Sequence, residues 1–102
     1  MLLQDKVAIV TGGSRGIGFA IVKEYLKNGA IVVLCGSRRE TAEKAVQELK
    51  AENAQWRVEG IWPDLTDYDS VKAAFDQVVK QYGRIDILAN NAGVSASEPI
   101  SA

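Results

Sequence analysis

The sequence contains no histidine, one cysteine and only two prolines in 102 residues. Without histidine there is no imidazole base and no imidazole metal ligand. The lone Cys35 can form neither an internal disulfide nor a CxxC metal site, so we expect no bound metal. Because Cys35 lies in an apolar run, we interpret it as a small buried hydrophobic residue rather than a reactive thiol.

An excess of charge of one sign is also lacking, since 12 Lys and Arg stand against 13 Asp and Glu. Binding to nucleic acid or to an anionic membrane needs a strong basic excess, so neither partner is expected. The longest apolar run, Ala30–Cys35, is far shorter than a membrane span of about 20 residues, and the start of the chain has no apolar segment of signal-peptide length. We therefore expect one soluble, cytoplasmic domain over residues 1–102.

Short apolar runs alternate along the chain with segments of helical period. The predicted strands are Val7–Val10, Ile31–Cys35, Gln55–Trp62 and Ile85–Ala89. The predicted helices are Ile17–Lys27, Arg39–Asn53 and Asp67–Tyr82, the last with Thr66 as its N-cap. The expected apolar face of the first helix consists of Ile17, Ala20, Ile21 and Tyr25. Residues 94–102 have no period and are expected to form a loop.

This alternation is the pattern of an open, doubly wound parallel α/β sheet with right-handed crossovers. We predict the strand order 3-2-1-4, with the helices from Ile17 and Arg39 on one face and the helix from Asp67 on the other. The last strand is then an exposed edge. Ligands of such sheets bind where the strand order reverses, which lies beside Thr11 and Asn90.

A glycine-rich segment joins the first strand to the first helix, with the sequence Thr11-Gly12-Gly13-Ser14-Arg15-Gly16-Ile17-Gly18. Glycines at such a junction allow a positive φ, close approach of a pyrophosphate to the backbone, and close packing of helix on strand. Free N–H groups and the helix dipole then attract the anion. The segment predicts a phosphate-binding loop, and a glycine-rich turn without a ligand is the alternative.

Three motifs occur in order, each at the end of a predicted strand. They are Thr11-Gly12-x-x-x-Gly16-x-Gly18, Asp64-Leu65 and Asn90-Asn91-Ala92-Gly93. This set resembles the short-chain dehydrogenase/reductase family, in its classical subfamily that includes 3-oxoacyl-carrier-protein reductases and many hydroxysteroid and sugar dehydrogenases. The resemblance implies a Rossmann-type fold and hydride transfer between a nicotinamide and a carbonyl or secondary alcohol carbon.

The same resemblance assigns the three motifs to parts of the cofactor. It implies that the pyrophosphate is held by Gly12, Gly16 and Gly18. It implies that the adenine is flanked by Asp64 and Leu65, and that the adenosine ribose is lined by Asn90, Ala92 and Gly93. Alternatively, Asp64 is a turn or cap residue before Thr66, and Asn90 and Asn91 form hydrogen bonds that stabilise the sheet.

The end of the second strand predicts which dinucleotide binds. A fold that takes NAD usually places Asp or Glu there, roughly 20 residues after the glycine loop, to bind the ribose hydroxyls. Here Gly36 leaves space instead, and Ser37 and Arg38 offer a hydroxyl and a guanidinium to a 2′-phosphate, with Arg15 in reach of the same group. We therefore expect NADP(H). The alternatives are that Ser37 is an N-cap with Glu40 and that the arginines are surface charge.

Tyr68 and Lys72 have the YxxxK spacing of the family's catalytic pair. The family's motif lies well beyond the Asn-Asn-Ala-Gly segment, whereas this pair opens the helix before it. We interpret the two residues as a solvated first helical turn, and we expect residues 1–102 to lack the catalytic Ser, Tyr and Lys and to be inactive alone.

The sequence thus predicts the cofactor-binding part of an oxidoreductase acting on a small-molecule carbonyl or alcohol. The resemblance implies a homo-oligomer for the full-length protein. The alternative is a non-catalytic module that binds or senses NADP(H). The candidate cofactor-binding residues are Thr11, Gly12, Ser14, Arg15, Gly16, Ile17, Gly18, Ser37, Arg38, Asp64, Leu65, Asn90, Ala92 and Gly93.

Overall fold

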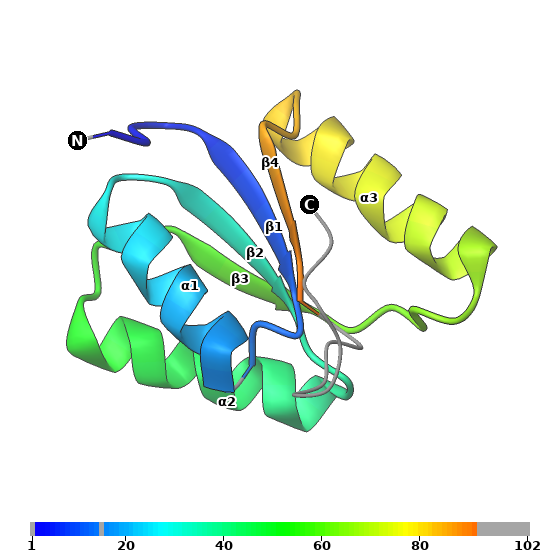
Figure 1. The fold of residues 1–102 in the computed structure, drawn as a ribbon, viewed down its shortest axis with the longest axis horizontal. Coiled ribbons are helices and arrows are strands. Elements are labelled where there is room, and N and C mark those ends of the chain that lie inside the picture. The colour runs from blue at the N-terminus through cyan, green and yellow to red at the C-terminus, as the bar shows by residue number, and fades with distance from the viewer. Residues whose placement is uncertain (1, 15, 92–102) are drawn as a thin grey trace.

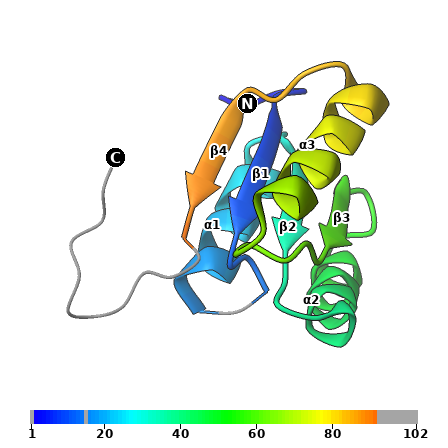
Figure 2. The ribbon, with the colours of Figure 1, turned by 90° about the vertical axis from the view of Figure 1, so that its right-hand side faces the viewer.

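The computed structural model describes residues 2–14 and 16–91. Its elements are β1 (Val7–Thr11), α1 (Gly16–Lys27), β2 (Ile31–Cys35), α2 (Arg39–Glu52), β3 (Val58–Ile61), α3 (Tyr68–Tyr82) and β4 (Ile87–Asn90). All paired strands are parallel, and their order across the sheet is β3-β2-β1-β4 (Figure 2). The predicted fold class and strand order are confirmed, whereas the predicted loop at 94–102 lies outside the described residues.

Alternate residues of the central strands divide the core between the two faces of the sheet. Ala8 and Val10 of β1 belong to a buried cluster formed with α1 and α2. Val7 and Ile9 belong to a second cluster, formed with α3. Figure 1 shows α1 and α2 on one side of the sheet and α3 on the other. Both predicted placements are confirmed, and a strand buried on both faces explains the unbroken apolar run of β1.

The face that α1 buries agrees only in part with the predicted one. The helix buries Gly18, Val22 and Leu26, whereas Ile17 is 66% exposed and Ala20 is exposed. These three buried residues follow the i, i+4, i+8 spacing of one helix face. Gly18 allows the helix to lie against the backbone of the preceding loop, and this close contact fixes which face turns to the sheet. Ile21 and Tyr25 are partly buried and pack against the core, so the prediction was right for these two residues and wrong for Ile17 and Ala20.

The ends of β3 and α3 also differ from the prediction. Gln55 and Trp56 precede β3, because their N–H groups donate to the side chain and carbonyl of Asn53 in a turn that follows α2. The N-cap of α3 is Asp67, whose carboxylate accepts from the N–H of Asp69 at 3.1 Å. The predicted cap Thr66 is wrong because α3 begins at Tyr68, which makes Asp67 the residue that precedes the helix.

The start of β4 also differs from the prediction. β4 begins at Ile87, two residues later than predicted, and forms the edge of the sheet with Leu88 52% exposed. Cys35 is buried, as predicted, and burial raises the pKa of its thiol to about 12.

Within the described part of the chain, no helix is long and apolar enough to span a membrane, and no three potential metal-ligating side chains of His, Cys, Asp or Glu type come together.

Candidate dinucleotide-binding site

The glycine-rich loop after β1 is fixed by backbone geometry. Gly12 and Gly16 adopt φ angles of 66° and 61°, in the left-handed region that glycine tolerates best. The N–H of Gly13 donates to the carbonyl of Cys35 at 3.2 Å, which ties the loop to the end of β2. The loop therefore lies beside the turn that leads into α2. Arg15 lies outside the described residues, so its predicted role is a proposal.

The glycines of this loop have two different surroundings. A Cβ on Gly18 would overlap the carbonyl of Gly12, and one on Gly13 would lie 2.9 Å from the Cβ of Leu34. By contrast, a Cβ on Gly16 would meet nothing within 4 Å. Gly13 and Gly18 thus let the loop pack closely against β2 and α1, while Gly16 faces open space. Gly13 was missed by the motif, although its place in the glycine run could have pointed to it.

The open space beside Gly16 lies at the N-terminus of α1, where a helix attracts anions. Helix α1 begins at this residue and has no acidic side chain in its first turn. Its first N–H groups lack partners within the helix, and the helix dipole adds positive potential there. Ile17 presents an exposed apolar side chain at the same end. The residues present therefore fit the pyrophosphate of a dinucleotide.

The turn between β2 and α2 leaves a hydroxyl and a guanidinium uncommitted. The N-cap of α2 is Arg38, and its N–H donates to the hydroxyl of Thr41 at 3.2 Å. The alternative of Ser37 as the N-cap is therefore wrong. Within the described part of the chain, the Ser37 hydroxyl has no hydrogen bond and Arg38 has no ion pair. Both groups remain available to a ligand.

The two neighbouring arginines of this turn differ in their partners. The Nε of Arg39 lies 2.9 Å from an oxygen of Glu43, and its guanidinium lies 6.0 Å from the ring centroid of Trp62. This pairing accounts for one of the two cations that begin the helix. Arg38 alone is left at the turn without a described counter-charge.

The sequence suggested that Gly36 leaves free space for a ligand. The structure contradicts this suggestion. A Cβ at this position would lie 2.9 Å from both the Cβ and the backbone nitrogen of Ala42. The first turn of α2 therefore occupies that space. A carboxylate introduced here would displace the helix as well as change the charge, so Ser37 is the better position for testing cofactor choice.

The ends of β1 and β4 are joined by a buried hydroxyl. Thr11, which is 4% exposed, donates from Oγ1 to the amide oxygen of Asn90 at 2.9 Å and accepts from the N–H of Asn91 at 2.9 Å. This supports the alternative that the asparagines stabilise the sheet. The Asn90 amide nitrogen has no hydrogen bond within the described part of the chain and can still face a ligand. Ala92 and Gly93 lie outside that part.

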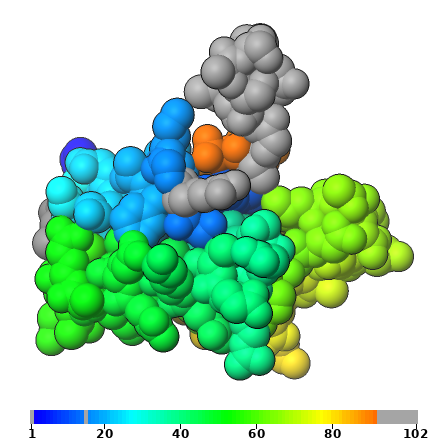
Figure 3. Space-filling view, turned by 90° about the horizontal axis from the view of Figure 1, so that it is seen from below, coloured from blue at the N-terminus to red at the C-terminus, as the bar shows by residue number. Residues whose placement is uncertain are grey.

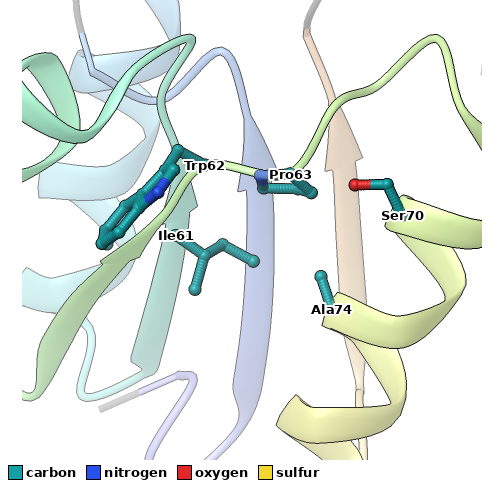
Figure 4. A pocket seen from close by; sticks show the side chains of 6 residues that line it. Ile61, Trp62, Pro63, Ser70 and Ala74 are labelled. Carbon is teal, nitrogen blue, oxygen red and sulfur yellow. The ribbon is translucent and has the colours of Figure 1, made fainter.

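Asp64 is engaged in the turn that precedes α3. Its Oδ1 accepts from the hydroxyl of Thr66 at 2.6 Å and from the Thr66 N–H at 3.0 Å, and these bonds lower the pKa of Asp64. Its own N–H donates to the hydroxyl of Ser70 at 2.9 Å. Figure 4 shows Ser70 facing Pro63 across the adjoining groove. The structure thus gives Asp64 the turn role that the sequence left open.

Some of the predicted residues line two cavities, and the others that the structure describes line neither. Thr11, Leu65 and Asn90 line one cavity of about 340 Å³. Ser14 and Gly16 line another of about 390 Å³, together with residues of α1 and α2. Neither of these two cavities is lined by Gly12, Ile17, Gly18, Ser37, Arg38 or Asp64.

Tyr68 and Lys72 do not form a catalytic pair in the structure. Tyr68 is 75% exposed in the first turn of α3. The Nζ of Lys72 lies 2.8 Å from a carboxylate oxygen of Asp76, one turn further along the helix, and this contact raises the pKa of Lys72. The structure agrees with the interpretation of a solvated helical turn.

A parallel sheet with a glycine loop leading into a helix at its strand-order reversal defines a dinucleotide-binding α/β protein. A family model described as "short chain dehydrogenase" matches residues 6–102. The chain belongs to this short-chain dehydrogenase family, as its motifs suggested.

Two curated relatives illustrate the similarity. The chain is 50% identical over 97 residues to a 3alpha-hydroxysteroid dehydrogenase of Mediterraneibacter gnavus, covering 95% of the chain and 39% of that relative. It is 40% identical over 94 residues to the 3-oxoacyl-[acyl-carrier-protein] reductase FabG of Chlamydia muridarum, covering 92% and 38% respectively. The chain therefore spans about two fifths of the length of these relatives.

Solved structures give the same result. A metagenomic short-chain oxidoreductase in complex with NADP superposes with a TM-score of 0.84 at 39% identity, covering 92% of this chain and 42% of that one. A variant of actinorhodin polyketide ketoreductase with NADPH superposes with a TM-score of 0.80 at 33% identity, covering 88% and 34%. Both neighbours hold the phosphorylated dinucleotide.

Proposed function

We propose that this chain is the NADP(H)-binding part of an oxidoreductase that moves hydride between the nicotinamide and a carbonyl or secondary alcohol carbon. The observation that carries the proposal is the uncommitted pair of Ser37 and Arg38 at the end of β2, where no carboxylate is present. The NADP and NADPH complexes of the two structural neighbours support the same choice.

The chain's own residues bind and orient the dinucleotide in this proposal. The open N-terminus of α1, with Gly12, Gly16 and Ser14 beside it, receives the pyrophosphate. Ser37 and Arg38 bind the 2′-phosphate through a hydroxyl donor and a charge-assisted hydrogen bond. The backbone of the Asp64-Leu65 turn and the end of β4 hold the adenosine. The bound cofactor supplies the hydride, and the protein supplies its position.

The same proposal treats residues 1–102 as one binding domain without proton-transfer machinery. Tyr68 and Lys72 are the described residues whose spacing resembles a catalytic pair. Lys72, however, forms an ion pair with Asp76. We therefore expect the 102-residue chain to reduce no carbonyl substrate on its own. The substrate class is a small-molecule ketone or alcohol, and the names of the two curated relatives suggest steroid ketones and 3-oxoacyl groups as the first to assay.

The proposal is tested with the protein purified at the length its gene encodes. NADPH oxidation is followed spectroscopically with a steroid ketone, a 3-oxoacyl thioester and a small hydroxyketone, and NADP⁺ reduction with the matching alcohols. We expect turnover with at least one of these pairs and none from residues 1–102 alone. If NADPH binds but no substrate is turned over in either direction, the protein is better described as a nucleotide-binding module.

A further inference from the structure

The cavity between α1 and α2 contains a cation that no sequence motif identifies. The cavity has a volume of about 390 Å³ and is lined by Ser14, Gly16, Phe19, Thr41, Lys44 and Glu48. Figure 3 shows the surface on which the glycine loop and the beginning of α2 meet. Half of the lining residues come from α2, which carries none of the three family motifs.

This cavity adjoins the turn that holds Arg38. The Thr41 hydroxyl accepts from the Arg38 N–H at 3.2 Å and donates to the Arg38 carbonyl at 2.9 Å. On the other side, the hydrogen bond from Gly13 to Cys35 holds the glycine loop at the end of β2. The cavity and the candidate 2′-phosphate site thus share a wall.

Lys44 is the uncommitted cation of this cavity. Lys23, on the facing helix, pairs with Glu52 at 2.9 Å, and Arg39 pairs with Glu43. Lys44 is exposed and has no ion pair within the described ranges, even with Glu48 one turn further along α2. A free ammonium on a flexible stem beside an open cavity is suited to an anionic ligand group.

We propose that Lys44 is a second specificity-determining cation for the 2′-phosphate of NADP(H), and that Thr41 is a positioning residue that fixes Arg38. This inference rests on the proposed function and extends its phosphate site from the β2 turn onto α2. The phosphate monoester is the part of the dinucleotide that carries an additional charge relative to NAD(H). Lys44 therefore acts on the choice between the two cofactors rather than on dinucleotide binding as such.

The test compares Lys44→Gln with Lys50→Gln in the protein at its gene-encoded length. Lys50 is a matched control because it is exposed on the same helix and has no ion pair within the described residues, but it does not line the cavity. Dissociation constants for NADPH and NADH are measured by nicotinamide fluorescence. We expect Lys44→Gln to weaken NADPH binding about three- to fivefold, as for an exposed ion pair, and to leave NADH unchanged. Lys50→Gln should change neither constant.

Salt and Thr41 variants distinguish a charge effect from a packing effect. The Lys44→Gln effect should largely disappear near 1 M salt, where the Debye length is about 3 Å. Thr41→Val should weaken NADPH selectively and reduce the effect of Arg38→Ala, while Thr41→Ser should restore binding. Equal weakening of NADPH and NADH by Lys44→Gln, or no weakening while the wild type still prefers NADPH, would overturn the inference. A wild type without any preference would instead overturn the proposed function.

Discussion

The polar side chains at the ends of neighbouring strands differ in how they are used. After β1 and β4, Thr11 and Asn90 bond to each other, and after β3 the Asp64 carboxylate bonds to Thr66. After β2, the side chains of Ser37 and Arg38 have no such partners within the described chain. Because the side chains after β1, β4 and β3 form these bonds within the fold, their hydrogen bonds contribute to its stability. The second group is free for a ligand within the described chain, and this difference is the basis for proposing that the β2 turn selects the cofactor.

The largest expected effect belongs to the glycine that supports the loop. Gly18→Ala should destabilise the protein by about 3 kcal/mol, because the new methyl group would overlap the Gly12 carbonyl. Gly16→Ala is the matched control, since it meets no atom within 4 Å and adds only the left-handed strain of about 1–2 kcal/mol. Urea unfolding measures both. Equal losses would mean that Gly18 is not a packing residue.

The side chains that bond to one another after β1 and β4 are tested by removing the hydroxyl of Thr11. Thr11→Val keeps the shape of the side chain but leaves the Asn90 oxygen and the Asn91 N–H without their partner. Because Asn90 is exposed and water can reach its oxygen, we expect a loss of about 0.5–1.5 kcal/mol in the free energy of unfolding. The same measurement on Ser37→Ala should show almost none, since its hydroxyl has no described hydrogen bond. A larger loss for Ser37→Ala than for Thr11→Val would reverse the comparison.

The free side chains after β2 are tested by introducing a negative charge at Ser37. Ser37→Asp should weaken NADPH about tenfold, because a carboxylate repels the 2′-phosphate, and a tenfold change corresponds to about 1.4 kcal/mol. NADH binding should hold or improve, since the carboxylate can accept from the ribose hydroxyls. Gly36→Asp should lower stability in addition, owing to its contact with Ala42. Titrations and unfolding curves of both variants separate the two effects, and unchanged NADPH affinity in Ser37→Asp would refute this site.

The smallest expected effect concerns Tyr68. Tyr68→Phe should leave turnover of the gene-length protein nearly unchanged, because this side chain is 75% exposed and its apparent partner Lys72 pairs with Asp76. Steady-state kinetics with saturating NADPH measures the turnover of the variant and of the wild type. A tenfold fall in turnover with folding and cofactor binding intact would show that the pair has a catalytic role after all.

Much of the fold follows from periodicity in the sequence. The unbroken apolar runs of β1 and β2 indicated strands buried on both faces, and right-handed crossovers then fixed the positions of the helices. The burial of Gly18 in α1 was not predictable in this way, because it depends on a backbone contact with Gly12. Backbone proximity leaves no periodic pattern in the sequence.

The candidate site was predictable where residues follow a strand end, and less so elsewhere. Ser37 and Arg38 could be proposed from the sequence because the end of β2 is a known position in dinucleotide-binding folds. Lys44, which we propose as part of the same site, could not, since it lies in the second turn of α2 and follows no strand end. The space assigned to Gly36 was wrong because Ala42 fills it, and such a contact between sequence neighbours six positions apart depends on how the turn folds.

The central claim is that the β2 turn selects the phosphorylated cofactor. Its most direct test is a pair of titrations with NADPH and NADH on the wild-type protein and on Arg38→Ala, at moderate salt. One charged hydrogen bond to the 2′-phosphate, worth about 1.5–3 kcal/mol before solvent screening, predicts roughly tenfold tighter NADPH binding by the wild type. Arg38→Ala should lose most of that preference and keep its NADH affinity. Equal affinities in the wild type, or a preference untouched by Arg38→Ala, would contradict the claim.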